Sequence, residues 1–247
     1  LLSLDIYLFE PNLVIGRANK FFLRTCKKIF CYSEELINFP TKFKDKITIV
    51  HPLVRKVFYN SNVTLKEKDE FRVLIVGGSQ GARIFDKDLK NVILNISKRH
   101  RIKVIHQTTE ENTENLKNFY SSNNIENLIF SFHRDFAKII KEVDLSITRA
   151  GASTLAELSI LNIPFLAIPL SLSKDNHQFE NASFYKDKNC CWILDQKFFD
   201  SKIEAVLKNI LENKVDYSQK KDNLKKLNYQ NTWINVNQKI LKEINEN

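Results

Sequence analysis

From Phe71 onward, short apolar runs alternate with longer stretches of mixed polarity. This alternation predicts strand and helix units around a parallel sheet, because each parallel strand is reached from the one before it through a covering helix. The predicted strands cover residues 72–76, 103–106, 127–130, 145–148, 165–168 and 191–194. The predicted helices fill the intervals, at residues 82–97, 110–122, 134–141, 153–161 and 176–187. The sequence therefore predicts an α/β fold with a doubly wound sheet.

The sequence ahead of this alternation holds fewer predicted elements: an opening strand, one helix, and short strands at 30–32 and 47–50. Such a segment buries too little surface for an independent core, and the polar stretch at 60–69 that follows it indicates a linker. We expect residues 1–65 to form a partial amino-terminal domain with its linker. Residues 66–230 form the complete α/β domain, and residues 231–247 form a helix that packs back toward the amino-terminal part.

The balance of charge points to an anionic partner. The chain carries 38 Lys and Arg against 29 Asp and Glu, a formal net charge of +9, which suits nucleic acid, an acidic membrane surface or phosphorylated small molecules. The longest apolar run, at 163–172, is interrupted by Pro164 and Pro169 and is too short to cross a bilayer. The four cysteines form no metal-binding spacing and are expected to be buried free thiols in a reducing compartment.

Five cations between residues 17 and 28 recur at helical spacing and fall within an arc of roughly 100°, with apolar residues opposite. The cations are Arg17, Lys20, Arg24, Lys27 and Lys28, and the apolar residues are Phe22, Leu23, Cys26, Ile29 and Phe30. The pattern predicts a helix whose basic face rests on anionic lipid headgroups. A solvated helix face is the alternative. Nucleic-acid binding is disfavoured, because no aromatic side chain interleaves the basic stripe.

A glycine turn follows the first strand of the predicted sheet. Gly77, Gly78 and Gly81 let the backbone turn tightly and approach a ligand, and Ser79 adds a hydroxyl donor. This predicts a phosphate-binding loop at a helix start, with a purely structural turn as the alternative. The dinucleotide fingerprint and the Gly-Lys-Ser/Thr run of a Walker loop are both absent from the sequence, so NAD is not expected.

Two further polar segments, 149–157 and 169–181, follow later strands. A glutamate such as Glu157 near a helix start ordinarily interacts favourably with the positive end of the helix dipole. Its carboxylate is also able to accept two hydrogen bonds from a ribose diol. All three loops leave the carboxyl ends of parallel strands, where open α/β sheets hold ligands. The sequence therefore predicts a nucleotide diphosphate site.

Together these segments resemble the MurG family, the bacterial N-acetylglucosaminyltransferases of peptidoglycan synthesis, in glycosyltransferase family 28. The family's three motifs are matched by residues 77–83, by Arg149, Gly151, Ala152, Thr154 and Glu157, and by Asp175, His177, Gln178, Asn181 and Ala182. Weaker matches lie at residues 9–19 and 50–55.

The resemblance implies a GT-B fold, with one complete Rossmann-like domain here and the carboxyl-terminal remainder of a second. It implies an inverting transfer of GlcNAc from UDP-GlcNAc to lipid I, undecaprenyl-pyrophosphoryl-MurNAc-pentapeptide, to form lipid II. No metal and no cofactor are implied. The implied partners are the lipid-linked acceptor and the anionic inner-membrane surface, with cell-wall synthesis proteins as candidates and no nucleic acid. The implied location is peripheral, on the cytoplasmic face of that membrane.

Substrate-binding roles follow from the same resemblance. On the nucleotide side, Ser79 and the surrounding backbone would hold phosphate, Glu157 the ribose hydroxyls, and His133 would pack by the uracil. Thr154 belongs to the same motif as Glu157, and Arg55 would lie near the diphosphate.

On the sugar side, His177 and Gln178 would contact the GlcNAc, and Asn12 would reach it from the opposite domain. The sequence identifies no catalytic base.

The chain departs from the family ahead of these motifs. Nothing corresponds to the family's opening glycine-rich loop, and Phe9 and Pro11 replace a histidine and a glutamine. We therefore expect a chain that lacks the amino-terminal part and binds UDP-GlcNAc without unaided turnover. One alternative is the donor-binding subunit of a split N-acetylglucosaminyltransferase, which is inactive without an acceptor-domain partner. A related GT-B enzyme acting on another lipid, or a decayed remnant of the gene, is another.

Overall fold

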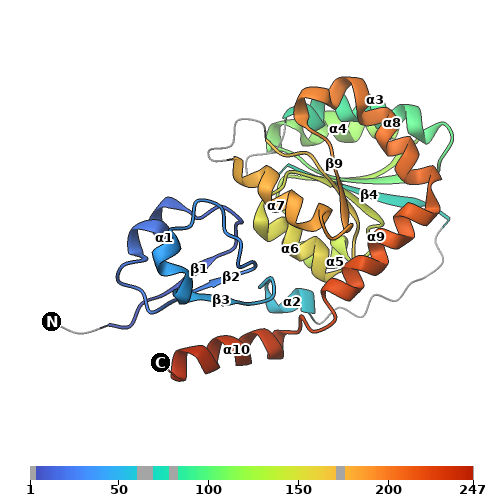
Figure 1. Ribbon diagram of the computed structural model, residues 1–247. Helices are drawn as coiled ribbons and strands as arrows, with labels where there is room; N and C mark the ends of the chain where they lie inside the picture. The colour runs from blue at the N-terminus through green and yellow to red at the C-terminus, as the bar shows by residue number, and fades with distance from the viewer. Residues whose placement is uncertain (1–3, 60–68, 78–82, 171–175, 247) are drawn as a thin grey trace.

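The computed structural model describes residues 4–59, 69–77, 83–170 and 176–246, which form two parallel sheets (Figure 1). The small sheet has the order β1-β2-β3, with β1 at Tyr7–Glu10, β2 at Lys28–Cys31 and β3 at Ile47–Ile49. The large sheet has the order β6-β5-β4-β7-β8-β9. Its strands are β4 at Phe71–Val76, β5 at Ile102–Gln107, β6 at Glu126–Phe130, β7 at Leu145–Thr148, β8 at Phe165–Ala167 and β9 at Cys191–Ile193.

All paired strands of the large sheet are parallel, and all six predicted strands are present. Apolar side chains alternate between its two faces: Leu74 belongs to one core cluster, and Val73 and Ile75 belong to the other. Both faces are covered, which explains why the central strand β4 has an unbroken apolar run from Val73 to Val76. The predicted α/β doubly wound sheet is therefore confirmed.

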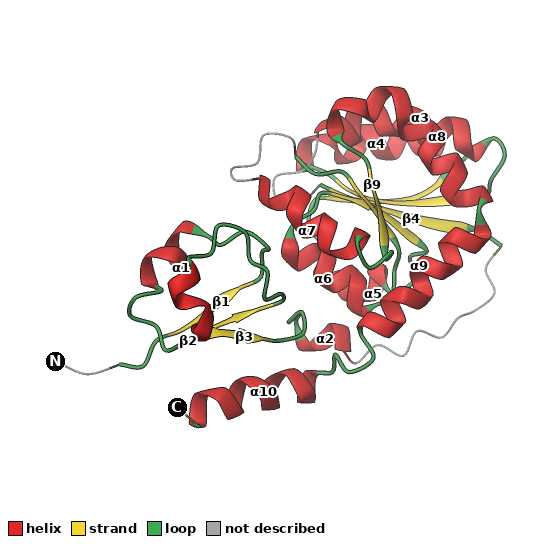
Figure 2. Ribbon diagram, viewed as in Figure 1, coloured by secondary structure: helices red, strands yellow, loops and turns green. Residues whose placement is uncertain are grey.

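Helices cover the two faces of the large sheet in separate layers (Figure 2). One layer contains α3 at Lys90–Ser97, α4 at Glu110–Ser122 and α8 at Phe199–Glu212. The other contains α5 at Phe136–Ile140, α6 at Ala152–Ile160, α7 at His177–Lys186 and α9 at Lys214–Leu227. A π-helical turn at Phe85–Leu89, η2, precedes α3, and a short 3-10 helix at Gln196–Phe198, η4, precedes α8.

The small sheet has its own core and one short helix, α1 at Arg17–Phe22. The prediction of one helix carrying all five cations through Lys28 is wrong, because α1 ends at Phe22 and Lys28 begins β2. The β-branched and aromatic residues that follow fit a strand, and β2 is the central strand, paired on both sides with β1 and β3. Tertiary pairing thus overrides the local helical pattern. A six-residue 3-10 helix, η1 at Thr41–Lys46, leads into β3.

Helix α2, at Lys56–Tyr59, lies between the two sheets, and helix α10, at Trp233–Asn245, lies along the smaller one. The chain enters α10 through Asn231, whose Nδ2 donates to the Pro52 carbonyl at 3.1 Å. Figure 1 shows α10 running back beside the small sheet, where the Tyr7 hydroxyl donates to the Ile244 carbonyl at 3.2 Å. The last helix therefore contacts the first strand of the chain.

The four cysteines, Cys26, Cys31, Cys190 and Cys191, are buried and free, as expected. Burial raises the pKa of the Cys31 thiol to about 12 and that of Cys190 to about 11. The thiols therefore stay protonated at neutral pH and act as small apolar groups.

Candidate functional site

The strand order creates one topological switch point in the large sheet. The chain passes from β4 outward to β5 and β6, then returns to β7 on the other side of β4 and continues to β8 and β9. Open α/β sheets bind ligands in a crevice at such a switch point, at the carboxyl ends of the strands. β4 ends at Val76, whose carbonyl accepts a hydrogen bond from the Arg149 amide at 3.2 Å.

The predicted phosphate loop is only partly described. Gly77 follows β4 directly, whereas Gly78, Ser79 and Gly81 lie outside the described residues. On the far side of this loop, the ring of Phe85 lies under the Arg149 guanidinium, 5.2 Å from the ring centroid. Arg149 Nη1 also donates to the Ile168 carbonyl at 2.9 Å. Arg149, which follows β7, thus contacts the segments that follow β4 and β8.

Glu157 and Thr154 both lie on α6, which begins at the switch point. Gly151 is the N-cap residue and no side chain caps the helix, so Thr154 lies inside the first turn. Glu157 lies one turn further on. Burial raises the pKa of its carboxyl group, and the charge of Arg55 opposes that effect.

Arg55 reaches Glu157 from the small-sheet side of the molecule. Its Nη2 lies 3.4 Å from Oε1 of Glu157, and 63% of the Arg55 side chain is exposed against 16% for Glu157. A cavity of about 460 Å³ adjoins this pair and is lined by Leu53, Val54, Arg55, Ser153, Glu157 and Trp233. Two predicted site residues far apart in sequence are thus brought into contact beside a cavity.

Asn12 contacts the domain of the large sheet through Asn181, a residue for which the sequence predicted no role. Asn181 on α7 is 3% exposed. Its Nδ2 donates to Asn12 Oδ1 at 3.1 Å and to the Ala150 carbonyl at 3.2 Å, and its Oδ1 accepts from the Leu13 amide at 3.0 Å. Asn181 therefore joins the loop after β1 to the loop after β7. Its place in the third motif was the only signal for it.

Glu10, which belongs to the weaker match at residues 9–19, is a second organising residue for which the sequence predicted no role. It ends β1 with 2% of its surface exposed. Its carboxylate accepts hydrogen bonds from the Gly16 amide at 2.7 Å, from Asn19 Nδ2 at 2.9 Å and from Asn12 Nδ2 at 3.0 Å. These bonds compensate the buried charge and fix the loop that presents Asn12.

His177 and Gln178 form the start of α7, after Asn176 in the left-handed region with φ 54°. The Gln178 side-chain oxygen accepts from the Leu170 amide at 3.0 Å, so the helix start is held against the segment that follows β8. The preceding Asp175 lies outside the described residues.

His133 lies apart from these residues, on the loop after β6. β6 is at the far edge of the sheet, two strands away from β4. The Nδ1 of His133 accepts from the Asp135 amide at 3.1 Å, and its ring meets Phe130 edge-on at 5.7 Å between centroids. The loop still leaves the same edge of the sheet as the other site loops, because all six strands are parallel.

The predicted basic face contains three cations, not five. Arg17, Lys20 and Arg24 are exposed on α1 and the turn after it. Lys27 instead pairs with Asp5 at 2.9 Å, and Lys28 lies 3.9 Å from Glu243 of α10.

Two aromatic side chains lie beside the three exposed cations. Phe21 is 77% exposed and Phe22 is 44% exposed, so the expectation that Phe22 faces the core is wrong. No helix among the described residues is long and apolar enough to span a bilayer. Within the same part of the chain, no group of three or more His, Cys, Asp or Glu side chains is placed to hold a metal ion.

Comparison with known proteins identifies the family. Residues 72–232 match the glycosyltransferase family 28 C-terminal domain. A protein of Pelagibacter ubique (strain HTCC1062), named "UDP-N-acetylglucosamine--N-acetylmuramyl-(pentapeptide) pyrophosphoryl-undecaprenol N-acetylglucosamine transferase", is 50% identical over 100% of this chain and 70% of its own length. A Rickettsia felis protein of the same name is 34% identical over 79% of this chain and 57% of its own length. The chain thus spans only part of these relatives.

The crystal structure of Acinetobacter baumannii MurG superposes on the whole chain and on 69% of its own length, with a TM-score of 0.77 and 23% identity. The two parallel sheets and this likeness define a protein of the GT-B class with a Rossmann-like carboxyl-terminal domain, as predicted. The chain belongs to glycosyltransferase family 28, and within it to the MurG family.

Proposed function

We propose that this chain is the donor-binding part of an inverting transferase that moves GlcNAc from UDP-GlcNAc to lipid I and so forms lipid II in peptidoglycan synthesis. The observation that carries the proposal is the 50% identity, across the whole chain, to a relative named for this transfer. The switch-point crevice supports it, because a nucleotide diphosphate suits the carboxyl ends of β4 and β7.

The nucleotide half of the proposed site lies around α6. The amides after Gly77, with Ser79, hold the phosphates, and Glu157 accepts hydrogen bonds from the ribose hydroxyls with Thr154 one turn before it. Arg55 lies close enough to Glu157 to reach the diphosphate of the same ligand. His133 borders the base from the loop after β6.

The sugar half lies at the start of α7. His177 and Gln178 contact the GlcNAc, and Asn12 approaches from the small sheet, held by Asn181. Transfer leaves negative charge on the departing UDP. The loop amides are fixed donors that stabilise that charge without reorganisation, which is how preorganised electrostatics lower a barrier, and the Arg55 guanidinium adds a positive charge once it turns from Glu157 to the diphosphate.

The proposed division of the chain follows the sheets. Residues 1–65 form a partial acceptor-side domain with its linker, residues 66–230 the UDP-sugar domain, and residues 231–247 the returning helix. The acceptor-side part is proposed to meet the cytoplasmic face of the inner membrane through α1, with Arg17, Lys20 and Arg24 on anionic headgroups. Contacts with other cell-wall synthesis proteins belong to the same proposal.

Titration calorimetry of the 247-residue chain with UDP-GlcNAc, and with UDP-glucose for comparison, tests the donor site. We expect UDP-GlcNAc to bind, and Glu157→Ala to weaken binding by roughly 1 to 3 kcal/mol, because the ribose hydroxyls lose a charged acceptor. Glu114→Ala, an exposed position on α4, is the matched control and should leave affinity unchanged. Folded chain that binds neither nucleotide sugar would contradict the donor assignment.

A turnover assay with lipid I separates the transferase from the split-enzyme alternative. The chain alone is expected to bind donor without turnover. Turnover that returns only when a separate acceptor-domain chain is added would favour the donor-binding subunit of a split enzyme.

A further inference from the structure

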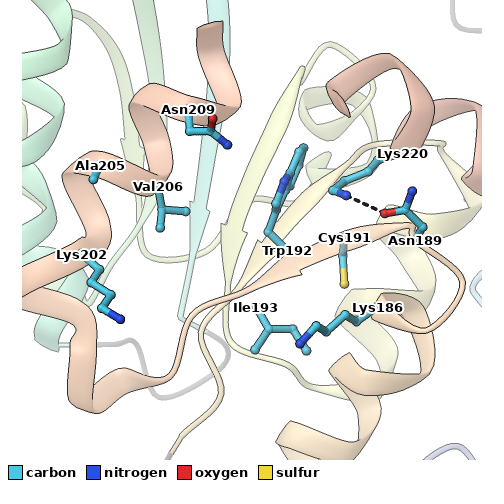
Figure 3. A pocket seen from close by; sticks show the side chains of 10 residues that line it. All are labelled: Lys186, Asn189, Cys191, Trp192, Ile193, Lys202, Ala205, Val206, Asn209 and Lys220. Atoms are coloured by element: carbon cyan, nitrogen blue, oxygen red, sulfur yellow. Dashed lines mark hydrogen bonds between the residues drawn. The ribbon is translucent and has the colours of Figure 1, made fainter. Parts of the chain in front are cut away.

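A groove follows the outer edge of the large sheet, away from the switch point. β9 is the last strand in the sheet order, two strands beyond β7. Along it lies a cavity of about 570 Å³, which none of the candidate site residues line. Its lining residues are Lys186, Asn189, Cys191, Trp192, Ile193, Lys202, Ala205, Val206, Asn209 and Lys220 (Figure 3).

The floor of the groove is a strand with one free side. The Leu194 amide donates to the Ala167 carbonyl at 3.0 Å, so the backbone at Leu194 faces β8. Backbone groups alternate sides along a parallel strand, and those of Ile193 therefore face away from β8, into the groove. β9 pairs only with β8 in the part of the chain that the structure describes. Such an edge presents unpaired donors and acceptors to another strand.

The walls of the groove are positively charged. Figure 3 shows α8 with Lys202 on one side of β9, and the Lys186 side chain extending toward Ile193 from the other. Neither lysine makes an ion pair within the described residues, although Lys202 Nζ lies 4.4 Å from the Phe198 ring centroid. No Asp or Glu is among the lining residues of this cavity.

The third lysine that lines the groove, Lys220, is buried. Lys220 is 5% exposed and donates to Asn189 Oδ1 at 2.8 Å and to Asp216 Oδ1 at 3.0 Å. Its ammonium lies 4.8 Å from the Trp192 ring centroid, and the Trp192 Nε1 donates to Asp216 Oδ2 at 2.8 Å. Asp216 balances this charge locally, so Lys186 and Lys202 are the cations left to attract a ligand.

We infer that this groove, between α8 and the carboxyl-terminal end of α7, binds an extended acidic segment of a partner protein, which pairs with β9 as an additional strand. The open backbone of β9 supplies the hydrogen bonds, and Lys186 and Lys202 meet carboxylates on the added strand. Ala205 is small and leaves room beside the strand. The inference does not depend on nucleotide-sugar binding at the switch point.

Fluorescence anisotropy tests the inference, with a labelled peptide of alternating glutamate and valine as the probe. The peptide should bind the 247-residue chain, and the double variant Lys186→Glu/Lys202→Glu should weaken binding by about tenfold or more, since two attractive pairs become repulsive. The double variant Lys117→Glu/Lys138→Glu, at exposed positions on α4 and α5, makes the same change in net charge elsewhere and should have little effect. Circular dichroism confirms that both variants fold.

Two further peptides separate strand pairing from charge. A peptide of alternating lysine and valine should not bind. The acidic peptide with every backbone nitrogen methylated should lose binding, because it has no donors for β9. Equal binding of the methylated peptide would show a nonspecific anion site and overturn the inference.

Trp192 gives a local readout, because the chain has two tryptophans and Trp233→Phe leaves only this one. Its fluorescence should change on addition of the acidic peptide. No binding and no fluorescence change would overturn the inference. Self-association of Lys186→Glu/Lys202→Glu would strengthen that conclusion, since the two lysines would then serve only to prevent edge-to-edge pairing of β9. A dimer that the peptide dissociates would place a second copy of this chain in the groove and would also overturn it.

Discussion

At the residue scale, one buried charge outside the candidate site is Asp86, on η2 just after the glycine loop. It is 8% exposed, and its Oδ2 accepts from Thr108 Oγ1 at 2.7 Å and from Asn112 Nδ2 at 3.0 Å. The Nε2 of His106, a fully buried residue on β5, lies 3.1 Å from Oδ1. These contacts fasten the segment after β4 to the end of β5, so they stabilise the frame of the crevice.

The pKa of Asp86 makes this frame sensitive to acid. Burial raises that pKa, but His106 and the hydrogen bonds from Thr108 and Asn112 outweigh burial and lower it below the ordinary 3.8. A lowered folded-state pKa stabilises the protein above pH 3.8, and that stabilisation is lost as pH falls through the folded value.

We therefore expect Asp86→Asn to lower the free energy of unfolding by about 1 to 3 kcal/mol at neutral pH, with a smaller difference in acid. Urea denaturation at several pH values measures both. Asp222→Asn is the control, because Asp222 forms an exposed pair with Lys225 and should change little. A loss that is the same at every pH would contradict the role of the ionised carboxylate.

At the scale of elements, the difference between sequence and structure is greatest at α1. The cations from Arg17 to Lys28 have helical spacing, yet only the first part of that segment is a helix. Periodicity reports local preference, whereas the parallel pairing of β2 with two neighbours is nonlocal and cannot be read from spacing. The central strands β4 and β7 were predictable because each is a short run with buried side chains on both faces of the sheet, whereas the edge strand β6 is only half-buried and was predictable from its apolar residues alone.

The corrected α1 surface predicts how the protein meets a membrane. Its exposed aromatic pair, Phe21 and Phe22, can insert between headgroups while Arg17, Lys20 and Arg24 contact them. In flotation with anionic vesicles, we expect Phe21→Ser/Phe22→Ser to lower the bound fraction several-fold, and high salt to lower it further through the cations. Lys27→Gln/Lys28→Gln should behave nearly as the parent chain, since both lysines lie beside acidic residues. Unchanged flotation of the aromatic variant would rule out this surface.

At the scale of the whole molecule, the sequence predicts candidate residues at the carboxyl ends of the strands but does not show how the two sheets meet. Glu157 and His177 come after the strands that the sequence predicts at 145–148 and 165–168, whereas the order of the strands comes from the structure. The Asn12 to Asn181 bond and the contact of α10 with Tyr7 join residues far apart in the chain. Such pairs depend on the packing of complete elements, and no local pattern encodes them.

The contact between Arg55 and Glu157 has a thermodynamic consequence for the proposed nucleotide site. Arg55 contacts the carboxylate that we propose binds the ribose, and it would therefore compete with the ribose for Glu157. A ligand with a diphosphate compensates by taking Arg55 for itself, but a nucleoside cannot.

Replacing Arg55 by alanine should therefore have opposite effects on two ligands. We expect Arg55→Ala to bind uridine more tightly than the parent chain and UDP more weakly, in each case by up to about 1 kcal/mol, because the Arg55 side chain is largely exposed. Calorimetry with both ligands measures the two changes, and Lys56→Ala, at the neighbouring exposed position, controls for loss of charge. A change of the same sign for both ligands would show that Arg55 does not compete for the carboxylate. Opposite signs would mean that the contact of Arg55 with Glu157 lowers the affinity for a nucleoside, and that the phosphates of a nucleotide relieve this effect by binding Arg55.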